Sequence, residues 1–426
     1  MTKSDFKLRD NCSSGVPLTI VGSLAFVFGI AESSPATFGF GVALLLLPVV
    51  MYWMVVRTLA GLKVQRDAPP RAFEGDTIEV SIRLENSSRW PAFQPRVSEI
   101  FVPEIHAQKE VLFPYRVRAG EKVEASYPGK CLLPRGVYEP GPVAISLSDP
   151  FGWFQLRKSV RPAGELKVYP RFDLFGVDER RGEVLSLTNE QLTRFGVGQS
   201  TEFFTVREYR SGDPLRRVHW PLTAHRGFPV VREFSRQATG DLYLYLDLMR
   251  TGLLGIGRGS SLEYAVRIVA ALAAHALRRG HRVQACAVGA VDNHFLPLHG
   301  GQLQLNALLD LLVVLKPDGS TPLDQLLEET AEDVPSGATV VLMVNPYLRD
   351  SRQFDRQVQA FQRRGVRPLL VVFDDATFHN VYRPPADRES TESAVRRFNR
   401  LGAETYVVPC PANLPAIFAN SAGGTA

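Results

Sequence analysis

The sequence predicts three parts in order: two N-terminal transmembrane helices, a small β-sandwich, and an α/β domain with an open, mostly parallel sheet. Two uncharged apolar stretches predict the helices. Strict alternation of apolar and polar residues predicts the sandwich, and a regular succession of strand and helix patterns predicts the open sheet. At 426 residues, the chain is long enough for two or three domains.

The membrane hairpin is expected over residues 1–61. Phe38–Val56 carries no charge and would extend about 28 Å as a helix, close to the ~30 Å of a bilayer's hydrocarbon core. Gly15–Ala31 is shorter but also uncharged. A cleaved signal peptide is the alternative for this first stretch, but the residues after it lack a small-x-small cleavage motif and a second apolar stretch follows at once.

Basic residues flank the hairpin on both sides, and the turn between its helices has none. The positive-inside rule then places both ends of the hairpin in the cytoplasm. We therefore expect a multi-pass protein of the bacterial inner membrane with cytoplasmic soluble domains. The flanking residues are Lys3, Lys7 and Arg9 before the hairpin, and Arg57, Lys63 and Arg66 after it.

The β-sandwich is expected over residues 62–154. Thr77–Leu84 alternates strictly, and Val143–Leu147 repeats the pattern. No helical period interrupts these runs, which favours a sandwich. The turn residues Asp149–Gly152 would close it.

The α/β domain is expected over residues 240–426. Leu242–Leu248 is a nearly continuous apolar run, as in a strand covered on both faces. Ser260 and Glu263 form a capping box for a helix that ends near Arg279, before Gly280. Further strands are expected at 282–288, 340–344, 369–373 and 405–408, and further helices at 303–315, 323–332, 354–364 and 393–401. Because ligands bind at the carboxyl ends of such strands, the loops after Leu248 and Val344 are the candidate site.

Composition excludes some classes of function. A net charge of +5 and a pI near 9.0 suit an anionic membrane surface or an acidic partner, but are too weak to indicate nucleic acid binding. The four cysteines include no CxxC pair. The sequence therefore predicts neither a zinc site nor a disulfide framework.

Residues 155–239 link the two predicted domains and contain a dense run of charges and aromatics, TVREYRSGDPLRRVHW. Arginine and carboxylate side chains pair directionally, so this run suits an interdomain ion-pair clamp. An exposed surface for a partner protein is the alternative. The candidate residues are Arg207, Glu208, Arg210, Asp213, Arg216 and Trp220, with Arg232 and Glu233 further along.

The same region resembles the signature of the bacterial family catalogued as domain of unknown function 58. His225 stands where that signature has an arginine. The resemblance implies a C-terminal domain similar to the von Willebrand factor A fold and a MoxR-type AAA+ ATPase as partner, with a transglutaminase-like membrane protein as a further partner. The matching residues are Arg207, Glu208, Tyr209, Gly212, Asp213, Arg216, Trp220, Ala224, Arg232 and Glu233.

Domains similar to von Willebrand factor A often hold Mg²⁺ through D-x-S-x-S with a distant Thr and Asp. By this resemblance Asp247, Thr251 and Thr321 match three ligand positions, whereas Met249 and Asn345 replace two others. A thioether is a poor Mg²⁺ ligand, and asparagine removes a charge. We expect a degenerate site and no cofactor.

Two hypotheses of function follow. The first is a non-enzymatic membrane-anchored adaptor that works with the ATPase to assemble or remodel a membrane complex. The second is a hydrolase or nucleotide-dependent enzyme that uses the Arg207–Trp220 stretch or the Gly255–Gly259 loop. That loop lies between a strand and a helix, as a phosphate-binding loop does, but Ser260 stands where the third glycine of G-x-G-x-x-G belongs.

Overall fold

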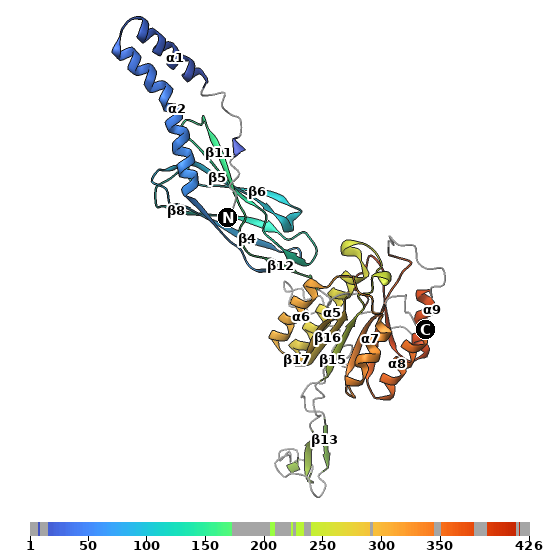
Figure 1. Ribbon diagram of the computed structural model, residues 1–426. Coiled ribbons are helices and arrows are strands. Elements are labelled where there is room, and N and C mark those ends of the chain that lie inside the picture. The colour runs from blue at the N-terminus through green and yellow to red at the C-terminus, as the bar shows by residue number, and fades with distance from the viewer. Residues whose placement is uncertain are drawn as a thin grey trace. The chain divides into compact units, whose positions relative to one another are not determined.

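The computed structural model describes residues 7–8, 16–172, 205–208, 223–224, 227–233, 240–289, 293–344, 351–378, 390–414 and 417. The chain divides into two compact units, Met1–Tyr169 and Pro170–Ala426. The first contains the apolar helices and a β-rich domain, and the second contains a mixed sheet with helices (Figure 1).

Two apolar helices begin the first unit, α1 (Val16–Ala31) and α2 (Pro35–Gly61). Helix α2 is the one helix of the described residues that is long and apolar enough to cross a membrane. Helix α1 has 16 residues, fewer than the ~20 of a typical span. The two helices pack closely: a Cβ on Gly29 would lie 2.4 Å from the backbone nitrogen of Phe38, and one on Gly41 2.5 Å from that of Phe26.

The β-rich domain contains three sheets. Their strand orders are β1-β11-β10-β5-β6 with β7 paired to β5, β2-β4-β8, and β3-β12-β9. The strands are β1 (Lys7–Leu8), β2 (Leu62–Asp67), β3 (Arg71–Phe73), β4 (Thr77–Asn86), β5 (Ala92–Phe101), β6 (Ala107–Leu112), β7 (Arg116–Val117), β8 (Lys122–Lys130), β9 (Gly136–Tyr138), β10 (Val143–Ser148), β11 (Gln155–Val160) and β12 (Leu166–Tyr169).

One hydrophobic core joins these sheets to the end of α2. The alternation in β4 is confirmed, because Ile78, Val80, Ile82 and Leu84 are all buried while most residues between them are more exposed. They cluster with apolar side chains of β5 and β10, and with side chains of the α2 end. The last turns of α2 are therefore part of the folded domain. In this core β5 contributes Val97, β10 contributes Ile145, and the end of α2 contributes Val55 and Leu59.

The β-rich domain extends past Phe154, where we expected it to end. Strand β11 pairs with β10 from Val143↔Val160 to Ser148↔Gln155, and β12 pairs with both β3 and β9. Strand β11 reads QLRKSV, with most of its residues partly or fully exposed. Such a polar strand has no apolar alternation, so pairing rather than pattern reveals it.

The second unit contains the predicted α/β alternation. Its strands are β15 (Asp241–Leu246), β16 (Arg282–Val288), β17 (Asn293–Gly300), β18 (Thr339–Val344), β19 (Arg367–Phe373) and β20 (Glu404–Val408). Its helices are α5 (Ser261–Arg278), α6 (Gln302–Val314), α7 (Leu323–Thr330), α8 (Ser351–Arg363) and α9 (Thr391–Arg400). The expected strands and helices are confirmed to within about three residues, a typical boundary difference.

The sheet order is β17-β16-β15-β18-β19-β20, and every neighbouring pair is parallel except β16–β17. Strand β17, which we did not predict, is an edge strand that contains Pro297. Helices α7, α8 and α9 cluster with Tyr243 and Tyr245 on one face. Helix α5 contacts β15 and β16 but contributes nothing to that cluster, so it covers the other face. The strand order reverses between β15 and β18, where ligands bind in such sheets.

Candidate functional site

The first loop of the candidate site follows β15, at the carboxyl edge of the sheet where the strand order reverses. The Asp247 Oδ1 atom accepts a hydrogen bond from the backbone N–H of Met249 at 2.8 Å. An aspartate that accepts from two residues further on folds a tight turn. Met249 then forms an isolated parallel bridge with Gly319. The Asp247 carboxylate therefore shapes the path from β15 to a second loop.

Gly319 holds the second loop against the first. Its N–H donates to the Leu248 carbonyl at 2.9 Å, and its carbonyl accepts from the Arg250 N–H at 3.2 Å. A Cβ on Gly319 would lie 2.5 Å from the Val288 carbonyl oxygen, which no real Cβ tolerates. Glycine at 319 thus lets three chain segments meet at the ends of β15 and β16. The sequence signal that could have found it is a lone glycine inside a polar loop.

A third loop, residues 254–261, closes on itself before α5. Leu254 N–H donates to Ser261 Oγ at 3.1 Å, and Ser261 N–H donates to the Leu254 carbonyl at 2.8 Å. Gly255 has a φ of +74°, and a Cβ there would lie 2.4 Å from the Gly259 carbonyl oxygen. The backbone conformation and this close contact explain why position 255 is a glycine, without any role in phosphate binding. The predicted helix cap is also present, because Ser260 Oγ accepts a hydrogen bond from the Glu263 N–H at 3.4 Å.

The three predicted metal-ligand residues lie on the first two loops. Thr251 is exposed and Thr321 is partly exposed, and each lies two residues beyond the Met249–Gly319 bridge. Asn345 lies outside the described residues. Among the residues that the structure describes, no group of three or more His, Cys, Asp or Glu side chains is arranged to hold a metal ion.

The signature region contributes a two-stranded antiparallel ribbon, β13 (Thr205–Glu208) and β14 (Val230–Glu233). Its register pairs Thr205 with Glu233 and Glu208 with Val230. Position 207 is thus diagonal to 233, and position 208 is diagonal to 232, so each diagonal joins an arginine position to a glutamate position. The other signature candidates lie outside the described residues: Arg210, Asp213, Arg216 and Trp220.

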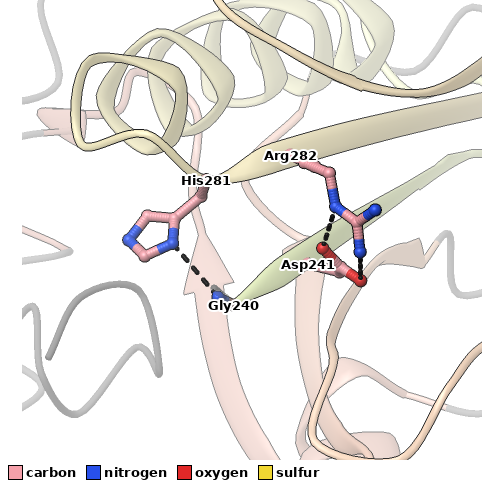
Figure 2. A network of polar contacts seen from close by, with 4 residues as sticks. All are labelled: Gly240, Asp241, His281 and Arg282. Atoms are coloured by element: carbon pink, nitrogen blue, oxygen red, sulfur yellow. Dashed lines mark hydrogen bonds and ion pairs between the residues drawn. The ribbon is translucent and has the colours of Figure 1, made fainter. Parts of the chain in front are cut away.

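A polar network lies at the opposite, amino edge of the sheet, where the chain enters β15. Figure 2 shows its three hydrogen bonds. The Gly240 N–H donates to His281 Nδ1 at 3.1 Å, and Arg282 donates twice to Asp241, at 2.8 and 2.7 Å. Burial lowers the pKa of His281, and the nearby charge of Arg279 lowers it further. The neutral imidazole can therefore accept from Gly240 near neutral pH.

Comparison with known proteins assigns the family. A family model described as "Protein of unknown function DUF58" matches residues 205–374. The uncharacterized protein YeaD of Bacillus subtilis (strain 168) is 21% identical over 270 residues, which cover 60% of this chain and 62% of YeaD. Residues 205–374 of the chain therefore belong to the DUF58 family. The match spans about three fifths of the length of this curated relative.

Solved structures add little to the DUF58 assignment. The manganese-loaded TRAP protein of Plasmodium vivax is 17% identical, with 38% of this chain and 73% of that chain covered and a TM-score of 0.24. The CARDB domain of the Pyrococcus furiosus PF1109 protein, in complex with di-metal ions, is 10% identical, with 25% and 86% covered and a TM-score of 0.18. Likenesses this weak carry no argument about fold or function.

Replacing Gly319 by alanine is expected to separate the first two loops of this DUF58 protein. The new methyl group would press on the Val288 and Leu248 carbonyls, and overpacking of this kind costs about 1–3 kcal/mol. Hydrogen exchange of peptides covering 247–254 and 317–322 should become faster. Gly300→Ala is the matched control, because its Cβ would meet only ordinary contacts at 3.5 and 3.8 Å. Unchanged exchange in Gly319→Ala would show that the bridge does not hold the loops.

Mg²⁺ is expected to bind weakly or not at all. Met249 offers a thioether where an oxygen is needed, and Asp247 Oδ1 already accepts a backbone hydrogen bond. Calorimetric titration of the full chain in detergent should therefore give little heat at physiological Mg²⁺. Stoichiometric heat that disappears in Asp247→Ala would contradict this expectation.

Proposed function

We propose that this DUF58 protein is a non-enzymatic adaptor, anchored in the bacterial inner membrane, that engages protein partners through the loop that follows β15 and the loop that contains Gly319. Its proposed principal partner is a MoxR-type AAA+ ATPase, and a transglutaminase-like membrane protein is a second. The role is the assembly or remodelling of a membrane complex.

The loop geometry carries this proposal. The carboxylate of Asp247 is used to shape its own loop, and Gly319 ties that loop to the next through backbone hydrogen bonds. Backbone-held loops form a pre-ordered surface, which lowers the entropy cost of binding a partner. This arrangement favours a binding platform over a catalytic centre built on Asp247.

The proposal includes a fold class for each of the two soluble domains. Numbered along the chain from β15, the sheet order is 3-2-1-4-5-6 with an antiparallel third strand. We assign this domain to the von Willebrand factor A-like class implied by the signature resemblance, and the β-rich domain to the β-sandwiches. All three sheets of that domain contribute to one core, as the facing sheets of a sandwich do.

Both α1 and α2 are proposed to cross the membrane as a hairpin, with the soluble domains in the cytoplasm. Strand β1 precedes α1 and pairs with β11, while α2 ends in the core of the same domain. Both ends of the hairpin therefore lead to one folded domain, which requires them on one side of the bilayer. The basic flanks favour the cytoplasmic side.

Purification of the full chain from cross-linked native membranes tests the proposal. The ATPase should be recovered with wild type and with Gly300→Ala, and recovered less with Gly319→Ala. A reporter active only outside the cytoplasm, fused after Ala426, should be silent. Equal recovery with both glycine variants would contradict the loop platform, and an active reporter would contradict the topology.

A further inference from the structure

Helix α2 is longer than a bilayer's hydrocarbon core, and its excess length lies inside the β-rich domain. Its 27 residues extend about 40 Å, against ~30 Å of hydrocarbon. About 20 residues from Pro35 therefore cross, which brings the bilayer surface to the level of Tyr52, Trp53 and Met54. The next residue, Val55, is already buried in the domain core. At the end of α2, therefore, no linker separates the membrane from the domain.

Exposed aromatic side chains gather at this level. The Trp53 ring lies 6.4 Å from that of Trp90, and the Tyr52 ring lies 5.6 Å from that of Phe154. Trp53 is 49% exposed and Trp90 is 43% exposed. The guanidinium of Arg57 lies 5.2 Å from the centre of the Trp53 ring. The cluster thus combines amphipathic rings with a cation.

The turn that leads into β11 adds a second aromatic pair beside the first. Phe151 stacks on Trp153 with ring centres 4.6 Å apart, and Phe151 is 57% exposed. The Tyr115 hydroxyl donates to the Pro150 carbonyl at 3.4 Å, so another exposed ring lies against this turn. The turn immediately precedes Phe154, which contacts α2.

We propose that the β-rich domain docks on the lipid headgroup layer through an aromatic rim formed by Tyr52, Trp53, Trp90, Tyr115, Phe151 and Trp153. Tryptophan and tyrosine concentrate at this depth because their rings have an apolar body and a polar edge. These rings are exposed in the folded chain because they form its membrane-facing surface. The inference rests on the membrane anchoring in the proposed function.

The connection to the hairpin holds the rim in place. Helix α2 enters the core directly, and β1, on the other side of α1, pairs with β11. The direct entry of α2 holds the domain near the bilayer, whereas a flexible linker in its place would let the domain move away. The rim therefore stays at the bilayer surface.

Single-tryptophan variants of the full chain test the docking. Trp220 and two of the other three tryptophans are replaced by phenylalanine, which leaves only Trp53, Trp90 or Trp153. Each variant is reconstituted in phosphatidylcholine–phosphatidylglycerol vesicles that contain lipids brominated near the headgroup or near the bilayer centre. Trp90 and Trp153 should lose fluorescence to the shallow bromines nearly as much as Trp53 does, and much less to the deep ones.

Failure of the membrane anchor and failure of the docked rim give different quenching patterns. If Trp53 is quenched while Trp90 and Trp153 are not, the helix crosses the membrane but the rim does not dock, and the inference is wrong. If Trp53 is not quenched either, the anchoring itself fails, and the inference falls with it.

A charge change supplies a second measurement. Phe151→Asp in the Trp153-only protein should reduce quenching by the shallow bromines, because a carboxylate resists transfer into the interface. Ile105→Asp is the matched control. Ile105 is 67% exposed but follows the far end of β5, about 30 Å along that strand from Trp90. Equal loss of quenching in both variants would refute docking through this rim.

Discussion

Replacing Arg66 by alanine is expected to destabilise the β-rich domain by about 3–5 kcal/mol, the usual cost of breaking a buried ion pair. Arg66 on β2 donates to Glu99 on β5 at 2.6 Å, so the pair joins two different sheets. The Glu99 side chain is 1% exposed, and that of Arg66 is 11% exposed. Removing Arg66 would leave a carboxylate inside the core without its charge partner.

Two control variants separate the causes. Arg83→Ala breaks a pair with Glu124 whose side chains are both 49% exposed, and should cost about 0–1 kcal/mol. The double variant Arg66→Met with Glu99→Leu should recover most of the lost stability, because it removes both charges. Urea unfolding of the full chain in detergent, with hydrogen exchange of β4 and β5 peptides, measures each. A small effect of Arg66→Ala would mean that water solvates Glu99 in the variant.

The second unit is expected to lose about 2 kcal/mol of stability between pH 8 and pH 5 through His275 alone. Burial lowers the pKa of His275 from 6.5 to about 4, and Arg279, Arg278 and His281 lower it in the same direction. In the pH window between these two values the unfolded chain binds more protons than the folded chain. The stabilising effect of the neutral imidazole is therefore complete above pH 6.5 and is lost as the pH falls towards 4.

A variant without the titrating group measures this contribution. His275→Gln should flatten the pH dependence of unfolding, followed by hydrogen exchange of peptides from α5 and β16. The residual slope belongs in part to His281, whose pKa is also lowered and whose Nδ1 accepts from Gly240 only when deprotonated. An unchanged pH profile in His275→Gln would show that other groups control acid sensitivity.

Elements with strong periodicity were predictable from the sequence. The alternation in Thr77–Leu84 and the apolar stripe of α5 each require burial on one face, so they identify β4 and α5 directly. Strands β11 and β17 were not found, because their sequences QLRKSV and NHFLPLHG show no such period. Strand β17 is an edge strand, which needs only one partner and tolerates polar residues and proline, and β11 has only the two-residue strand β1 on its outer side. Their place comes from pairing with β10 and β16.

The candidate site was predictable in position but not in construction. The carboxyl ends of β15 and β18 follow from the strand and helix alternation. Asp247 was singled out by the resemblance to von Willebrand factor A domains. The bridge between Met249 and Gly319 joins positions 70 residues apart, and no local pattern records it. The signature region is similar: its motif is visible in the sequence, but the register that makes 207 diagonal to 233 comes from the paired strands.

The sequence by itself determined the DUF58 membership, the apolar N-terminal helix and the α/β alternation, because each depends on residue identity or on short-range periodicity. Only the tertiary structure decided that Arg66 meets Glu99 across the core, that α2 ends inside the β-rich domain, and that Gly319 joins two loops. These three features depend on contacts between residues distant in the chain. Such contacts form only when burial of the apolar faces has brought the elements together.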